Sequence, residues 1–276
     1  MPKMLLMPKG TVCAVLIVMM CAVSATACAD ITVYYLDVGH GDCTIITCDG
    51  AAMIIDGGRP GKSDMVFSFL RSHGIATIQA AIATHPDSDH IGGLPAAFHA
   101  STVNMLYVPI LEYEAKRHNT LMRTARDAGV PIVIPKDGDT FQLGGATVTI
   151  IVPSVPNPTD NDLSLITRVV YGEHAFLFCA DIDAHIEDML LRDNRAIQAD
   201  VLKVAHHGSE TATTPAFLHA VNPSYAVISS NDQYGAAENE VTARIEDAGI
   251  TLLHTYHHGS ITITSDGSTI TALTEK

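Results

Sequence analysis

A dense group of histidines and aspartates follows an apolar run that ends near residue 84, and it limits what this chain can fold into more than any other feature. Four imidazole or carboxylate side chains fall within six residues, namely His85, Asp87, Asp89 and His90. Because alternate residues of an extended segment point the same way, the first two can bind one metal ion while the last two turn towards a second. A polar loop with a helix N-cap is the simpler explanation, but four ligand-type groups this close together are rare in plain loops. The segment therefore predicts a site for two divalent metal ions, with Zn²⁺ favoured and Mn²⁺ as the alternative.

The chain from residue 30 onwards alternates between strands and helices, in two halves of similar character. Period-two apolar patterns and the turn signal Asp49-Gly50 predict strands, and apolar faces at helical spacing predict helices. The expected strands are 31–37, 43–48, 51–55, 78–84, 146–152, 163–171, 175–179 and 199–205, with paired strands in 251–273, and the expected helices are 62–73, 114–128, 183–192 and 238–248. We therefore expect one α+β domain over residues 30–276, in which two sheets pack together and helices cover their outer faces.

Residues 1–29 differ from the remainder in composition. Lys3 and Lys9 precede an uncharged apolar run from Thr11 to Ala25, and two overlapping small-x-small cleavage motifs lie at its end. The run is shorter than the roughly 20 residues that a spanning helix needs. We expect a cleaved signal peptide over residues 1–29, and a mature protein that is secreted or extracytoplasmic and has no membrane span. Cys28 resembles the lipid-bearing cysteine of a lipobox, so a lipoprotein anchored there is the alternative.

The charge balance excludes an extended surface for nucleic acid. The full chain has 16 Lys and Arg against 30 Asp and Glu. Because residues 1–29 contain two lysines and no acidic residue, the mature chain has 14 against 30, a net charge of −16. Such a surface repels nucleic acid over most of its area, and the absence of tryptophan argues against a platform for base stacking. An anionic substrate would have to be captured locally, by metal ions.

Five motifs resemble those of one protein family. The His/Asp cluster is similar to the His-x-His-x-Asp-His signature of the metallo-β-lactamase superfamily, with Asp87 in place of the second histidine. The other motifs are Leu36-Asp37-Val38-Gly39-His40-Gly41-Asp42, Ile55-Asp56-Gly57-Gly58, Asn161-Asp162-Leu163-Ser164-Leu165 and Val201-Leu202-Lys203-Val204-Ala205-His206-His207-Gly208-Ser209. From about Ile31 to the C-terminus, the chain resembles the metallo-β-lactamase domain of the ComEC competence proteins. The resemblance implies a four-layer αβ/βα sandwich, with two packed mixed sheets and helices on the outer faces.

The resemblance also implies roles for individual residues. The first motif would divide between the two ions as its spacing suggests, and the carboxylate of Asp181 would bridge them. His206 would complete the second site. Apart from the resemblance, the place of His207 beside that ligand and before Gly208-Ser209 predicts that it donates a proton to the leaving group. The expected metal ligands are His85, Asp87, Asp89, His90, Asp181 and His206, and the expected catalytic residues are Asp89 and His207.

Three positions depart from the family pattern. The superfamily's further histidine ligand to the first ion has no counterpart here, and either Asp160 or Asn161 could replace it through oxygen. His40 stands where the family usually has glutamine, and it either lines the pocket or satisfies a tight turn. Family members often have Asn-x-Tyr-Gly-His-Pro after the late strand, and the segment from Asn231 to Ala237 lacks that histidine. The cluster His254-Thr255-Tyr256-His257-His258 lies in a predicted strand pair and is expected at the surface, with compensation for the missing histidine as the alternative.

The resemblance favours a binuclear metal-dependent hydrolase of the phosphodiesterase or nuclease type, acting on a small or single-stranded phosphodiester. Two other functions stay open: hydrolysis of another ester, thioester or amide, and a non-catalytic metal-binding module that kept the fold. A panel of substrates separates the first two functions, and metal content separates the third.

Overall fold

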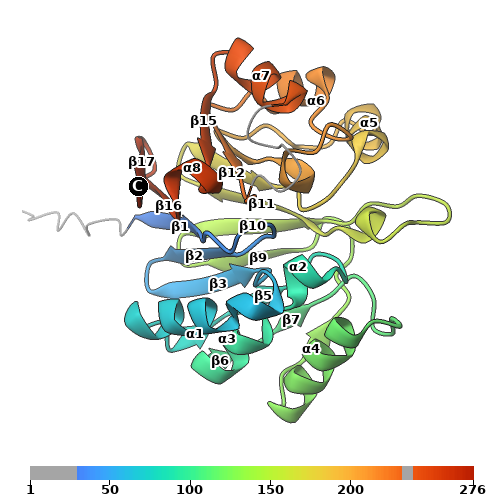
Figure 1. Ribbon diagram of the computed structural model, residues 1–276, viewed down its shortest axis with the longest axis vertical. Coiled ribbons are helices and arrows are strands. Elements are labelled where there is room, and N and C mark those ends of the chain that lie inside the picture. The colour runs from blue at the N-terminus through green and yellow to red at the C-terminus, as the bar shows by residue number, and fades with distance from the viewer. Residues whose placement is uncertain (1–29, 232–238) are drawn as a thin grey trace, which may run out of the picture.

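The computed structural model describes residues 30–231 and 239–276, and the expected signal peptide with Cys28 lies outside them. Two large sheets face each other across the middle of the molecule (Figure 1). The first contains β1 (Ile31–Tyr35), β2 (Thr44–Cys48), β3 (Ala51–Ile55), β5 (Ala80–Ile82), β7 (Leu106–Tyr107), β8 (Ile132–Val133), β16 (Ile261–Ser265) and β17 (Ile270–Thr274), in the order β17-β16-β1-β2-β3-β5-β7-β8. The second contains β9 (Thr140–Leu143), β10 (Ala146–Ile151), β11 (Ile166–Tyr171), β12 (His174–Phe178), β13 (Val201–Lys203), β14 (Tyr225–Ile228) and β15 (Thr251–His254), in the order β15-β14-β13-β12-β11-β10-β9.

Helices cover the outer faces of both sheets (Figure 1). They are α1 (Ser63–Ser72), α2 (Ser88–Ile91), α3 (Pro95–Ala100), α4 (Lys116–Asp127), α5 (Ala184–Arg192), α6 (Pro215–Val221), α7 (Glu240–Asp247) and α8 (Thr255–His258), with short 3-10 turns η1 (Pro60–Lys62), η2 (Asn161–Leu163) and η3 (Ala205–Gly208). Two short strands, β4 (Thr77–Ile78) and β6 (Thr102–Val103), pair beside α1 and α3. Within the described ranges, no helix is long and apolar enough to cross a membrane.

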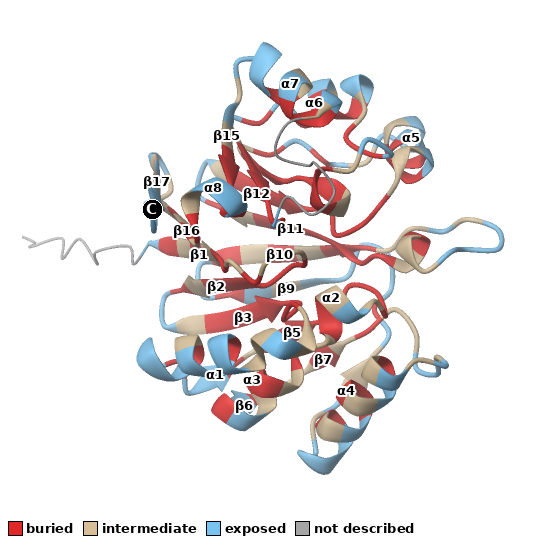
Figure 2. Cartoon of the chain, viewed as in Figure 1, coloured by how far each residue is buried: buried red, intermediate tan, exposed pale blue. Residues whose placement is uncertain are grey.

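Buried residues lie along both sheets and on the helices that face them (Figure 2), and their apolar side chains form three core clusters that explain the layered arrangement. Alternation along β1 buries Val33 between the sheets, where it joins Met53 of the first sheet and Phe176 of the second. The outer face of the first sheet packs against α1, α3 and α4, and that of the second against α5, α6 and α7. A sheet with two apolar faces has to be covered on both sides. The expected four-layer sandwich is therefore confirmed.

Several elements differ from the sequence-based expectations. The pattern does not predict α6 or β14, because each is too short for a periodicity to stand out. The helix expected over 238–248 begins at Glu240, since the Asn239 side chain accepts hydrogen bonds from the amides of Val241 and Thr242 and caps it. The surface position expected for His254 is wrong. This side chain is 2% exposed, and it caps α8 by accepting a hydrogen bond from the Tyr256 amide.

Strand direction brings the polar motifs to one edge of the sandwich. β1, β3 and β5 run in the same direction in the first sheet, and β12 and β13 run parallel in the second. The loops after these strands contact one another through backbone hydrogen bonds, such as that from the Asp42 amide to the Asp89 carbonyl (3.1 Å). Glycine is required where they cross, because a Cβ on Gly93 would lie 2.1 Å from the Gly57 carbonyl oxygen. This close approach holds residues 56–58 against the His/Asp cluster.

Candidate metal centre

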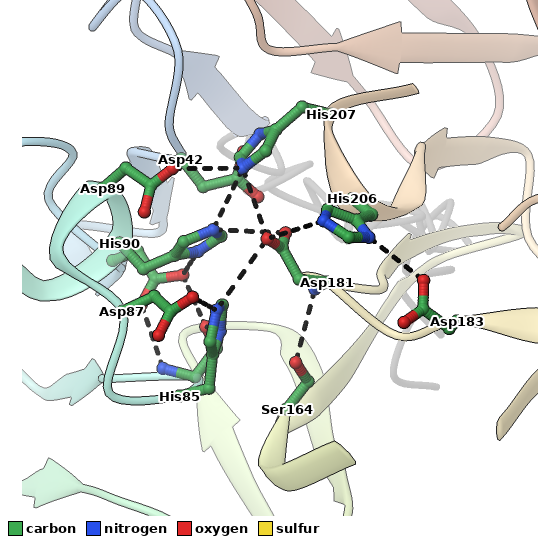
Figure 3. A network of polar contacts seen from close by, with 12 residues as sticks. Asp42, His85, Asp87, Asp89, His90, Ser164, Asp181, Asp183, His206 and His207 are labelled. Atoms are coloured by element: carbon green, nitrogen blue, oxygen red, sulfur yellow. Dashed lines mark hydrogen bonds and ion pairs between the residues drawn. The ribbon is translucent and has the colours of Figure 1, made fainter. Parts of the chain in front are cut away.

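Asp181 lies at the centre of the polar cluster shown in Figure 3. It follows β12, and only 4% of the residue is exposed. Its Oδ1 lies 3.1 Å from His90 Nε2, and its Oδ2 lies 3.4 Å from His207 Nε2 and 3.8 Å from His85 Nε2. A carboxylate that faces imidazole nitrogens on two sides is placed to bridge two cations.

A compact group of donor atoms surrounds one side of this carboxylate. Donor atoms of Asp42, His90, Asp181 and His207 all lie within 4.8 Å of one another. The Nε2 atoms of His90 and His207 are 3.2 Å apart, and Asp89 Oδ2 lies 3.8 Å from His207 Nε2. Because zinc lies about 2 Å from its ligands, donors that share one ion are roughly 3–4 Å apart. Asp89, His90, Asp181 and His207 therefore fit one divalent ion, which is the second ion expected from the sequence.

His85 and Asp87 form a more open group on the other side. The Nε2 atom of His85 is buried and has no hydrogen-bond partner among the described residues. It lies 3.7 Å from Asp87 Oδ2 and 3.8 Å from Asp181 Oδ2. Leaving a buried polar atom unpaired costs about 1–3 kcal/mol. A cation between these atoms would satisfy the nitrogen, so the residues fit the first ion.

Asp56 orients two of these histidines. Its place in the motif Ile55-Asp56-Gly57-Gly58 did not predict this role. Its fully buried carboxylate accepts hydrogen bonds from His90 Nδ1 (2.8 Å), the Thr84 amide (2.9 Å) and the Thr84 hydroxyl (2.7 Å). Since that hydroxyl already donates to Asp56, it accepts from His85 Nδ1 at 3.0 Å. Both imidazoles are thereby held with Nε2 as the acceptor nitrogen facing the site, as a metal ligand requires.

The adjacent histidines after β13 are placed differently from the sequence-based expectation. His207, expected to be a proton donor, is 1% exposed and lies among the donors of the second ion. Its Nδ1 donates to the Ser229 carbonyl oxygen at 3.0 Å. His206, expected at the second ion, has a half-buried side chain whose Nε2 is 4.0 Å from Asp181 Oδ2. The cause is the backbone, because both residues adopt the left-handed conformation, with φ values of 48° and 53°.

The buried charges of the site favour bound cations. Burial raises the pKa of Asp181, but the imidazoles of His207 and His90 outweigh burial and hold it well below its usual range. Burial lowers the pKa of His207, while Asp181 and Asp42 more than compensate and raise it to about 9. The carboxylates therefore stay ionised and attract positive charge, which protons or metal ions can supply.

The structure shows which groups surround Asp160, Asn161 and His40, the residues whose roles the sequence left open. The carboxylate of Asp160 accepts a hydrogen bond from the Tyr113 hydroxyl, and the Asn161 side chain hydrogen-bonds to Asp183. The His40 ring packs against His207 with ring centroids 4.4 Å apart, and its Nε2 lies 3.7 Å from Asp89 Oδ2. Burial and the neighbouring His207 lower the pKa of His40 to about 4. His40 thus lines the site as well as occupying a tight turn.

A cavity of about 610 Å³ adjoins the centre. Its lining consists of His40, His206, His207, Gly208, Ser209, Glu210, Thr211 and Asn239. Hydroxyl, amide and imidazole groups and the carboxylate of Glu210 line it beside the donors of the second ion, which suits a small polar molecule. Its size is that of a site for a small molecule, whereas a duplex would need an extended track.

The family model of the metallo-beta-lactamase superfamily matches residues 36–230, which is more than half of the chain. The chain is 28% identical over 247 residues to "ComE operon protein 3" of Bacillus subtilis (strain 168), a match that covers 82% of this chain and 32% of that protein. It is 28% identical over 238 residues to "Competence protein ComA" of Neisseria gonorrhoeae, covering 84% of this chain and 32% of that protein. The chain thus spans about a third of the length of these relatives, and the matches confirm the resemblance to competence proteins.

Solved structures support the fold. The metallo-beta-lactamase fold protein YhfI from Bacillus subtilis aligns with a TM-score of 0.58 at 12% identity, over 86% of this chain and all (100%) of that chain. CmlA, a diiron beta-hydroxylase from Streptomyces venezuelae, aligns with a TM-score of 0.54 at 15% identity, over 86% of this chain and 54% of that chain. The family match, the layered fold and the cluster of candidate ligands agree. The chain belongs to the metallo-beta-lactamase superfamily.

Proposed function

We propose that this chain hydrolyses phosphodiester bonds with the help of two divalent metal ions, Zn²⁺ or Mn²⁺. The observation that carries the proposal is the buried carboxylate of Asp181, which lies between His85 on one side and His90 with His207 on the other. When bound in such a site, two ions lower the pKa of a water molecule and stabilise the charge that develops on the phosphoryl oxygens.

The residues of this chain would bind the two ions as follows. His85 and Asp87 hold the first ion, and Asp181 joins it to the second. Asp89 and His90 hold the second ion, and we assign His207 to it as a ligand in place of the proton-donor role expected from the sequence. Three carboxylates and two divalent ions would leave a net charge of about +1, so an anionic diester can enter without strong repulsion.

The size and charge of the protein favour a small or single-stranded substrate. The cavity beside the second ion holds about 610 Å³, and the chain after residue 29 carries a net charge of −16, from 14 basic and 30 acidic residues. A protein that binds long duplex neutralises many phosphates with Lys and Arg and therefore becomes sensitive to salt. We expect this protein to gain its affinity through the metal ions, with turnover that depends only weakly on ionic strength.

A panel of substrates tests the proposed function. The metal-loaded protein should cleave an activated phosphodiester at least about 100-fold faster than a β-lactam or a thioester, because the diester offers the two ions a pair of phosphoryl oxygens that share one negative charge. Chelated protein serves as the control and should be inactive on all three. A thioester or lactam turned over orders of magnitude faster would replace the phosphodiesterase assignment with the other hydrolase function. A metal-loaded protein inactive on the whole panel would favour the non-catalytic module.

We infer that the chain is exported, because residues 1–29 combine a basic start, an uncharged apolar run and small residues at its end. Expression in a bacterial host should yield extracytoplasmic protein whose new N-terminus lies between Ala25 and Asp30, leaving residues 30–276 as the hydrolase domain. N-terminal sequencing and intact mass measure this. A diacylglycerol group on Cys28 would show the lipoprotein alternative, and full-length protein retained in the cytoplasm would contradict export.

A further inference from the structure

We propose that His206 is a ligand of the first metal ion and takes the place of the histidine that the superfamily has there and this chain lacks. The inference rests on the proposed function only in that the site holds two ions. Two adjacent histidines would then bind different ions, His206 the first and His207 the second. Figure 3 shows the two imidazoles approaching Asp181 from different directions.

The backbone after β13 explains how neighbouring residues reach one site. In an extended strand, consecutive side chains point to opposite faces. His206 and His207 instead both have left-handed backbone, with φ and ψ of 48° and 44° for the first and 53° and 26° for the second. This conformation is uncommon in residues other than glycine, although histidine adopts it more often than most, as asparagine and aspartate do, and two such residues in succession are costly. Strain of this kind is retained where it serves a site, and here it turns both Nε2 atoms towards Asp181 Oδ2, at 4.0 and 3.4 Å.

In metal-bound histidines, the ring nitrogen that faces away from the ion usually donates a hydrogen bond to an oxygen atom. Nδ1 of His206 is held in this way. It donates to Asp183 Oδ1 at 3.0 Å. Asp183 also accepts from the Thr211 hydroxyl and hydrogen-bonds to the Asn161 side chain. A carboxylate that accepts from Nδ1 fixes the tautomer, so that Nε2 carries the lone pair that a cation needs. His85, whose Nδ1 donates to the Thr84 hydroxyl, is prepared in the same way.

The Nε2 atoms of His85 and His206 face the same oxygen of Asp181, so an ion held beside that oxygen would be within reach of both. Asp181 Oδ2 lies 3.8 Å from His85 Nε2 and 4.0 Å from His206 Nε2, and His85 Nε2 lies 3.7 Å from Asp87 Oδ2. Donor atoms that share one ion lie roughly 3–4 Å apart. His206 is absent from the compact group of the second ion, which already contains His90 and His207.

The oxygen donors that the sequence left as alternatives are used elsewhere. Asp160 accepts from the Tyr113 hydroxyl. Asn161 lies beside Asp183, the carboxylate that orients His206, and lowers its pKa. Residues 160 and 161 therefore supply no ligand themselves. Their segment contributes indirectly, by supporting the His206 side chain.

Metal counting in single and paired variants tests this assignment. Asparagine is the substitution of choice, because it tolerates left-handed backbone and its shorter side chain withdraws the donor atom. In equilibrium dialysis with Zn²⁺ alone, the unchanged protein should retain about two ions, and H206N and H207N about one each. Electron paramagnetic resonance of Mn²⁺-loaded H206N should show an isolated ion where the unchanged protein shows a coupled pair.

Paired variants identify which ion is lost. H206N combined with D87A removes two ligands of the same ion and should still retain about one ion, whereas H206N with D89A should retain almost none. H207N is the matched control and should show the reverse pattern with the same partners. D183N should keep both sites but weaken binding of the first ion by about 10- to 100-fold. If H206N disturbs the circular dichroism spectrum, H206G, which accommodates positive φ, replaces it.

Two results would overturn the assignment of His206. One is H206N retaining two ions at unchanged affinity, and the other is H206N retaining one ion with D89A but none with D87A. Failure of the proposed function looks different. In that case the unchanged protein binds two ions and the paired variants behave as expected, but no phosphodiester is cleaved.

Discussion

Replacing Asp181 by alanine is expected to lower phosphodiester turnover by at least about 1,000-fold, because one side chain then disappears from both metal sites at once. Its Oδ1 lies 3.1 Å from His90 Nε2, and its Oδ2 lies within 4 Å of His85, His206 and His207 Nε2. Without the carboxylate, the buried imidazoles face one another with less negative charge to hold cations between them. Zn²⁺ content should fall together with kcat, measured on the same preparations by elemental analysis and with an activated diester.

Asp188→Ala is the matched control for this variant. Asp188 is an exposed aspartate on α5, a few residues further along the chain, and its removal should leave both metal content and turnover within about twofold of the unchanged protein. Chelation of the unchanged protein should reproduce the loss of turnover, and added Zn²⁺ or Mn²⁺ should restore it. An Asp181→Ala protein that retains substantial diester turnover would show that the reaction does not depend on the bridging carboxylate.

Replacing Lys203 by methionine is expected to lower the free energy of unfolding by about 3–5 kcal/mol, the cost of removing the cation closest to a buried carboxylate. Lys203 on β13 has a side chain that is 2% exposed, and its Nζ lies 2.8 Å from Asp42 Oδ1. Burial raises the pKa of Asp42, but Lys203 and then His207 outweigh burial and hold it far below its usual range. Methionine fills a similar volume, so the loss reports the charge rather than a cavity. Urea unfolding of metal-free protein measures it without a contribution from bound ions.

Two variants make this result specific. Lys203→Met combined with Asp42→Asn removes both charges and should recover a large part of the lost stability, since a neutral pair needs no buried counter-charge. Lys276→Met removes an exposed ammonium 3.9 Å from Asp37 Oδ2 and should change the free energy of unfolding by less than about 1 kcal/mol. Equal stability of Lys203→Met and the unchanged protein would mean that Asp42 is not held as a buried carboxylate.

Local patterns in the sequence determine the architecture and the position of the metal centre. Strand β1 is predictable because its alternation of buried and half-buried residues is a property of five consecutive residues. The cluster at residues 85–90 is predictable for the same reason, since one short segment carries four donors and its extended form sets their directions. Burial of His254 is not predictable in this way, because its position depends on how α8 closes against β15.

Long-range contacts decide which groups support the donors. Asp56 orients His90 from 34 residues away, and Lys203 neutralises Asp42 across the two halves of the chain. No local periodicity encodes such pairs, because they form only when the loops after β1, β3 and β13 meet at one edge of the sandwich. The same holds for Asp183, whose task is visible only once His206 lies beside it.

The directions of the His206 and His207 side chains are decided by tertiary structure alone. In the sequence they are two identical side chains at the end of a strand, and either could be the ligand. The turn that follows β13 is held by hydrogen bonds from the His206 amide to the Ala180 carbonyl (2.8 Å) and from the Ser209 amide to the His206 carbonyl (2.8 Å). These contacts hold both residues in the left-handed conformation. The direction of each imidazole therefore depends on an uncommon backbone conformation that the surrounding fold stabilises and that no local pattern in the sequence indicates.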